Sequence, residues 1–60
     1  MFSERFILQA KGMQTTTFDA DREGQAREEA KTLGQAVAVR LIDQETGRTL
    51  HATKSYREAA

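Results

Sequence analysis

The side chains that could carry out chemistry in this chain are few and widely spaced. His51 is the only histidine, and the sequence contains no cysteine. One histidine without cysteine cannot supply the ligands of a typical structural zinc site. The predicted cross-strand neighbour of His51 is Arg40, which favours a surface pair over a metal ligand or a general base. We therefore expect neither a metal site nor a catalytic histidine.

Three acidic residues, Asp19, Asp21 and Glu23, resemble an oxygen-ligand metal site only superficially. The glycine and the closing glutamate of a calcium-binding loop are not correctly spaced around them. The same residues suit the start of a helix, where Asp19 can cap the backbone and the helix dipole favours acidic side chains in the first turn. We interpret the group as a helix start.

Other catalytic patterns are also missing from the sequence. Ser3, Ser55 and the threonines belong to no evident histidine-carboxylate arrangement, and no glycine-rich phosphate loop follows a predicted strand. A ligand site also needs a pocket of about 300 Å³ or more, which one helix on a four-stranded sheet rarely encloses. We therefore predict that the chain is not an enzyme, and we expect no cofactor and no small-molecule substrate.

The length and composition limit the core and the class of partner. The chain has 60 residues and no cysteine, so it corresponds to one small domain without disulfides or thiolate metal sites. A domain of this size buries only about 60% of the surface that its unfolded chain exposes, so a second subunit could supply burial that the core lacks. Nine basic residues balance nine acidic ones. The chain therefore lacks the uniformly positive electrostatic potential that is typical of proteins that bind nucleic acids or membranes non-specifically.

The distribution of apolar residues predicts a cytoplasmic protein. The longest apolar runs are a few residues, whereas about 20 are needed to cross a bilayer. The N-terminus lacks the apolar core of a signal peptide. We expect no membrane partner.

A hairpin is predicted at the start of the chain. Residues 3–10 alternate between apolar and polar side chains, as a half-buried strand does. Gly12 can adopt the positive φ that a tight turn needs, and residues 13–18, rich in β-branched threonine, predict the returning strand.

The loop length of this hairpin decides which face Phe18 takes. A two-residue loop, Lys11-Gly12, puts Phe18 on the face opposite Phe6, whereas a three-residue loop, Ala10-Lys11-Gly12, puts both rings on one face. We prefer the three-residue loop, because it unites the aromatic residues in one core.

A helix is predicted next, from Ala20 to a C-terminal cap at Gly34. Its apolar stripe is narrow and made mostly of small side chains, so its axis can approach a sheet closely. The stripe consists of Ala26, Ala30 and Leu33.

A second hairpin follows the helix. Residues 35–42 alternate as a strand, and a four-residue loop from Gln44 to Gly47 predicts that Asp43 pairs with Arg48. The same register sets Leu41 opposite Leu50 and Val39 opposite Ala52. We expect one domain over residues 1–54 and a frayed tail over residues 55–60.

These elements predict an α+β fold with the order β-β-α-β-β. The sheet is four-stranded and mostly antiparallel, with one helix packed on one face. The strand order 2-1-3-4 keeps every pairing antiparallel and is the order we prefer.

The face of the sheet away from the helix is the candidate site. It is either an ordinary solvated face with scattered aliphatic residues or a contiguous patch that binds a protein partner or a second copy of the chain. The residues of the patch are Ile7, Met13, Ala36, Ala38 and Ile42.

An alternative function uses the same face to bind nucleic acid, since small sheet-plus-helix modules can lay strands in the DNA major groove. The face lacks the aromatic pair on which a single-stranded binder stacks bases. The basic residues assigned to this alternative are Arg5, Arg40, Arg48, His51 and Lys54.

Overall fold

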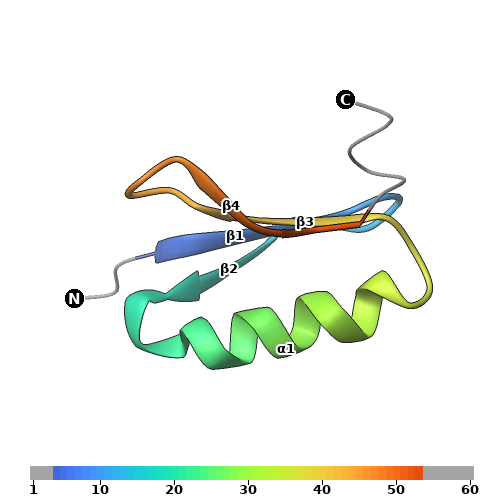
Figure 1. The fold of residues 1–60 in the computed structure, drawn as a ribbon, viewed down its shortest axis with the longest axis horizontal. Helices are drawn as coiled ribbons and strands as arrows, with labels where there is room; N and C mark the ends of the chain where they lie inside the picture. Colours follow the sequence, from blue (N-terminus) through green and yellow to red (C-terminus); the bar gives the residue numbers. More distant parts are fainter. Residues whose placement is uncertain (1–3, 54–60) are drawn as a thin grey trace.

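The computed structural model describes residues 4–53 (Figure 1). Its elements are β1 (Glu4–Ala10), β2 (Thr16–Asp19), the 3-10 turn η1 (Ala20–Arg22), α1 (Glu23–Gly34), β3 (Val39–Asp43) and β4 (Arg48–Ala52). Ser3, Lys54 and the predicted tail at 55–60 lie outside the described residues.

The four strands form one antiparallel sheet in the order β2-β1-β3-β4, and α1 runs along one of its faces (Figure 1). This arrangement confirms the predicted α+β fold and the preferred strand order. No helix or strand within residues 4–53 covers the opposite face, which we call the open face.

The hydrophobic core lies between the sheet and α1. Alternate residues of the two central strands and the small side chains of α1 are buried in it, as the predicted stripe requires. Leu33, Val37 and Leu50 pack partly buried against its margin. The buried apolar residues are Phe6, Leu8, Ala10, Phe18, Ala26, Ala30, Val39 and Leu41.

The first hairpin brings the two phenylalanines together. Phe6 pairs directly with Phe18, so the prediction that both rings share one face is confirmed. The predicted loop was wrong by two residues, since it would set Phe6 opposite Thr16. Strand β2 begins only at Thr16, and Met13 N donates to Ala10 O at 3.1 Å within the turn. A two-residue shift keeps each side chain on its face and aligns the aromatic rings.

The beginning of the helix differs from the prediction. Asp19 is extended and its side chain makes no capping hydrogen bond, and the 3-10 turn η1 separates it from α1, which starts at Glu23. The backbone therefore tightens through η1 before the α-helix begins, and the predicted cap at Asp19 was wrong.

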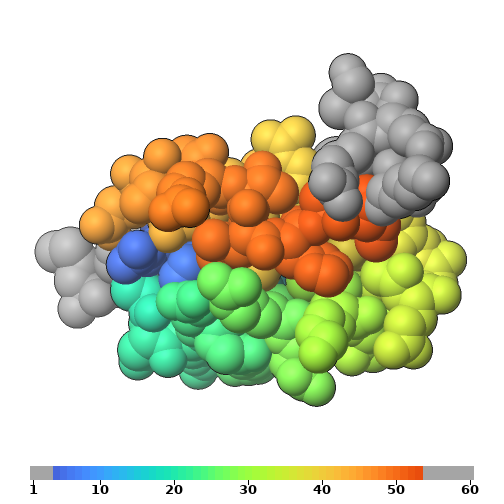
Figure 2. Space-filling model, in the orientation of Figure 1, coloured from blue at the N-terminus to red at the C-terminus, as the bar shows by residue number. Residues whose placement is uncertain are grey.

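Gly34 ends the helix for a different reason from the one predicted. It does not adopt positive φ, and the helical conformation continues to Gln35, at φ −75° and ψ −20°. A Cβ atom at Gly34 would lie 3.1 Å from Thr53 Cγ2 and 3.4 Å from Val39 Cγ2. Glycine is needed here because the helix end lies against the sheet. Figure 2 shows α1 and β4 in contact on this side of the molecule.

Strand β3 begins at Val39, four residues after the predicted start at Gln35. The intervening residues form the turn that leaves the helix, because Ala36 N and Val37 N both donate to Leu33 O, at 3.0 and 2.9 Å. These helix-end hydrogen bonds remove Ala36 from the sheet.

The second hairpin has the predicted loop but a different register beyond it. Asp43 pairs with Arg48, and Gly47 adopts φ +77° and donates from its N to Asp43 O at 2.7 Å. Leu41, however, pairs with His51, because a β-bulge makes Leu50 an extra residue on β4. The predicted pairs Leu41–Leu50 and Val39–Ala52 were wrong, and Leu50 packs only partly buried against the core.

Candidate interaction surface

A row of β-branched side chains crosses the middle of the open face. Ile7 and Ile42 stand directly opposite each other on the two central strands, and Thr17 and Thr49 pair with them from the edge strands. We call these four residues the central row. Ile7 and Ile42 are both partly exposed. The row therefore places two aliphatic side chains, flanked by threonines, at the centre of the uncovered face.

Opposite charges lie on either side of the central row. Thr17 Oγ1 donates to Glu4 Oε2 at 2.6 Å, which places the Glu4 carboxylate on the open face near the start of β1. Arg40 pairs with Gln9 near the end of β1 and with Ala52 on β4. The open face thus carries an acid at one end of its long direction and a base at the other.

The structure brings together only part of the predicted apolar patch. Ile7 and Ile42 form a cross-strand pair. Ala38 lies just before β3, where its carbonyl accepts a hydrogen bond from Lys11 N at 2.9 Å. Met13 belongs to the first hairpin loop and is 55% exposed, and Ala36 lies in the turn after α1. The sheet itself contributes the two isoleucines.

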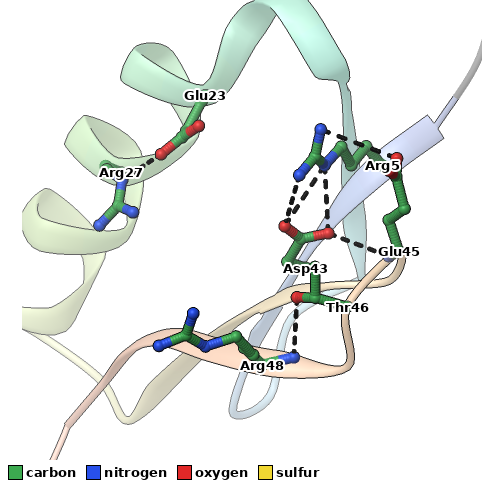
Figure 3. A network of polar contacts seen from close by, with 7 residues as sticks. All are labelled: Arg5, Glu23, Arg27, Asp43, Glu45, Thr46 and Arg48. Atoms are coloured by element: carbon green, nitrogen blue, oxygen red, sulfur yellow. Dashed lines mark hydrogen bonds and ion pairs between the residues drawn. The ribbon is translucent and has the colours of Figure 1, made fainter.

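Arg5 lies on the helix side of the sheet, although strand alternation predicts it on the open face. A β-bulge between Glu4 and Phe6 leaves Arg5 as an extra residue on β1. Its Nε and Nη2 atoms donate to the Asp43 carboxylate, the closest contact being Nη2 to Oδ2 at 3.0 Å (Figure 3). Arg5 Cζ also lies 5.4 Å from the centroid of the Phe6 ring. This cation is therefore paired within the fold.

The Arg5–Asp43 pair also holds the second hairpin loop. Asp43 Oδ1 accepts a hydrogen bond from Glu45 N at 2.9 Å, and Arg5 Nη1 lies 3.7 Å from Glu45 Oε2 (Figure 3). Gln44 N donates to Arg5 O at 2.8 Å. The hydrogen bonds from Arg5 lower the pKa of Asp43, against the opposing effect of burial, and the same contact raises the pKa of Arg5. These contacts give the cluster a structural role.

The remaining predicted basic residues do not gather on the open face. His51 Nε2 lies 3.8 Å from the position of a Cβ at Gly34, so the bulge in β4 has turned the ring toward the end of the helix. Arg48 pairs with Asp43, whose side chain is on the helix side. Of the described residues in the predicted nucleic-acid set, Arg40 alone remains on the open face, and Lys54 is outside the described range.

The two β-bulges are the features that sequence reasoning missed. Each one turns a basic side chain, Arg5 or His51, from the open face to the helix side. Strict alternation carries no sign of an extra residue in a strand. The one available signal was Asp43, a carboxylate at an inward-facing strand position that needed a cationic partner.

Within residues 4–53, no group of three histidine, cysteine or acidic side chains could hold a metal ion. No helix of the same range is long and apolar enough to span a membrane. No protein-family model, curated protein or solved structure matches the chain. The function must therefore be argued from the open face itself.

Proposed function

We propose that the chain is a small non-catalytic interaction module that binds a protein partner, or a second copy of itself, through its open face. The observation that carries this proposal is the cross-strand pair Ile7–Ile42 at the centre of a face that no described element covers. Two aliphatic side chains at adjacent positions of central strands are a common nucleus for sheet packing.

The size of the domain supports the same proposal. Within residues 4–53, the core rests on eight buried apolar residues, three of which are alanines. Covering the open face would complete the burial of Ile7 and Ile42 and gain about 25 cal/mol for each Å² of apolar surface removed from water. The flanking threonines add methyl groups without adding charge. A partner sheet or helix would therefore stabilise the domain as it binds.

Nucleic-acid binding has less support than protein binding. Arg40 is joined on the open face by the carboxylate of Glu4, which repels phosphate. Arg5 is neutralised by its ion pair with Asp43. The nucleic-acid alternative nevertheless makes a distinct prediction, namely binding that falls steeply with salt concentration.

The proposal is tested with a pair of double variants that add the same charge at different places. Ile7→Lys with Ile42→Lys charges the open face, whereas Gln25→Lys with Gln35→Lys charges exposed positions on and after α1. Each variant and the wild type are first checked for folding by circular dichroism. They are then immobilised to capture partners from the source cells, and their self-association is measured by sedimentation.

The proposal predicts that the open-face variant folds and loses both self-association and captured partners, while the control variant keeps them. Equal binding by both variants would contradict it. Retention of duplex or single-stranded nucleic acid only at low salt, with no protein bound, would instead support the alternative.

A further inference from the structure

The hydrogen bonds of β1 show which backbone groups of the edge strand β2 face outward. Gln44 N donates to Arg5 O at 2.8 Å, and Lys11 N donates to Ala38 O at 2.9 Å. Successive residues of a strand direct their N–H and C=O groups to opposite sides. The odd-numbered residues of β1 therefore face β3, and the even-numbered residues face β2.

The same alternation points the backbone of Thr17 away from the sheet. Thr16 and Phe18 pair with even-numbered residues of β1, so they use their N–H and C=O groups within the sheet. Thr17 lies between them, and its N–H and C=O groups point to the side on which the sheet has no further strand. Asp19, two positions later, is extended and repeats this direction. We call the outward backbone groups of Thr17 and Asp19 the free edge.

The centre of β2 carries none of the features that usually protect a sheet edge from pairing. Natural sheets block their edges with charged side chains, prolines or β-bulges. The other edge strand, β4, begins with Arg48 and is interrupted by the bulge at Leu50. Residues 15–18, by contrast, are three threonines and a phenylalanine, and β2 pairs regularly with β1 from Thr16 to Phe18. Of the two edges, β2 is therefore the one that can accept an additional strand.

A carboxylate lies over β2 beside the free edge. Thr17 Oγ1 donates to Glu4 Oε2 at 2.6 Å, so the Glu4 side chain extends from β1 across β2 on the open face. A strand added to the free edge would lie about 4.8 Å from β2, and a lysine or arginine on it can span that distance. Among residues 4–53, no cationic side chain forms an ion pair with Glu4. The carboxylate can therefore accept a cation from a bound segment.

We infer that the free edge binds an extended segment of another protein, which adds a strand to the sheet and places a lysine or arginine beside Thr17, where it pairs with Glu4. This site is separate from the proposed open-face function and does not depend on it. Backbone hydrogen bonds supply the affinity, and the cation supplies the preference among segments. A second copy of the chain fits poorly, because antiparallel pairing of two β2 strands keeps both Glu4 carboxylates on the same side and brings them toward each other.

Titration with three short peptides, followed by the amide resonances of the 15N-labelled chain, tests the inference. The probe is the peptide Ser-Thr-Val-Lys-Val-Thr-Ser, blocked at both ends. A charge control has glutamate in place of the lysine. A backbone control has N-methyl groups on the lysine and both threonines, the residues whose N–H groups would face β2.

Two variants of the chain complete the test. Thr17→Pro removes an outward N–H and no hydrogen bond between β1 and β2, so the sheet keeps its pairing. Glu4→Lys reverses the charge beside the free edge. Circular dichroism checks that each variant is folded, and the N-methylated peptide tests the same backbone contact on the wild type.

The lysine peptide should bind the wild type with a dissociation constant below about 1 mM, and the largest shifts should be those of the Thr17 and Asp19 amides. The N-methylated peptide, and the lysine peptide on Thr17→Pro, should bind at least about tenfold more weakly. The wild type should prefer lysine to glutamate about threefold, and Glu4→Lys should reverse this preference.

Three results would overturn the inference. The first is no binding of the lysine peptide at about 1 mM. The second is binding that N-methylation of the peptide leaves unchanged, which would show that the free edge does not form the contact. The third is a preference for lysine over glutamate that persists in Glu4→Lys, which would reject Glu4 as the partner of the cation.

Discussion

Arg5 and Asp43 are joined by a bidentate ion pair although 38 positions separate them in the chain. The pair links β1 to the last residue of β3 and holds the hairpin loop through Glu45. The Asp43 side chain is only 7% exposed, so removal of Arg5 leaves a buried carboxylate without its partner.

This pair predicts a specific pH dependence of stability. The pKa of Asp43 is lowered in the folded state by its hydrogen bonds from Arg5. The carboxylate therefore stabilises the fold above its unfolded pKa of about 3.9, and this contribution is lost as the pH falls through the lower folded value. Arg5→Met should reduce the melting temperature most near neutral pH, and the difference from the wild type should shrink below about pH 4.

The control for this prediction is Arg27→Met. Arg27 forms an exposed i,i+4 pair with Glu23 at 2.9 Å, which contributes about 0.3–0.5 kcal/mol. Thermal unfolding should show a much smaller loss for this control than for Arg5→Met. A difference between Arg5→Met and the wild type that stays constant from neutral pH to about pH 3 would disprove the assigned role of Asp43.

Replacement by alanine should have different effects on the stability of the domain at two glycines of the helix. A Cβ at Gly24 meets no atom within 4 Å, so Gly24→Ala should stabilise the domain by about 0.5–1 kcal/mol through helix propensity. At Gly34 the new methyl would lie 3.1 Å from Thr53 Cγ2. Thr53 cannot easily move, because its hydroxyl accepts a hydrogen bond from Val39 N at 3.0 Å. Gly34→Ala should therefore be at least about 1 kcal/mol less stable than Gly24→Ala.

Replacement of Thr53 with serine checks the cause of this difference. Serine retains the hydroxyl and removes the crowded methyl, so Gly34→Ala combined with Thr53→Ser should recover the gain in helix propensity. Urea unfolding of the single and double variants measures the coupling. Additive effects would show that the contact with Thr53 does not limit the site.

The two leucines of the second hairpin should differ sharply in their contribution. Leu41 is fully buried, whereas Leu50 is only partly buried at the margin of the core. Leu41→Ala should cost about 2–5 kcal/mol, comparable with the roughly 3–5 kcal/mol expected for a domain of this size, and should leave the chain largely unfolded. Leu50→Ala should cost about 1 kcal/mol. Equal losses in urea unfolding would contradict the bulged register.

The position of His51 gives an independent check of the bulge. In the observed register its imidazole lies beside Gly34, on the helix side. Proton NMR should therefore show nuclear Overhauser contacts between the His51 ring and the Gly34 α-protons. Contacts from His51 to Ile42 instead would indicate the regular register with His51 on the open face.

Local sequence patterns were sufficient to predict the order of the elements, whereas the strand order was a preference based on keeping every pairing antiparallel, which the structure confirms. The four-residue loop ending at Gly47 and the positive φ of Gly12 follow from turn chemistry, and the burial of Phe6 with Phe18 follows from alternation. The turns depend on residues that are close in the sequence, and the burial of the rings depends on the alternation of side chains between the two faces of a strand.

The candidate site was predicted only in its centre, Ile7 and Ile42. The positions of Arg5 and His51 depend on two β-bulges, and the bulge at Arg5 lets its side chain reach the distant Asp43 carboxylate. Strict alternation does not encode an extra residue in a strand. The role of Gly34 depends on how closely the helix end approaches Thr53, which is a tertiary distance. Contacts across the fold decided each of these positions.

The most direct test of the central claim is sedimentation equilibrium of the wild type beside the variant Ile7→Lys with Ile42→Lys, over a micromolar concentration series. The open-face account predicts a wild-type mass that rises toward twice the 6.7 kDa chain, and a folded variant that stays at 6.7 kDa throughout. A variant that associates as strongly as the wild type would contradict it, and a wild type that stays at the single-chain mass would leave only a different protein as the occupant of the open face.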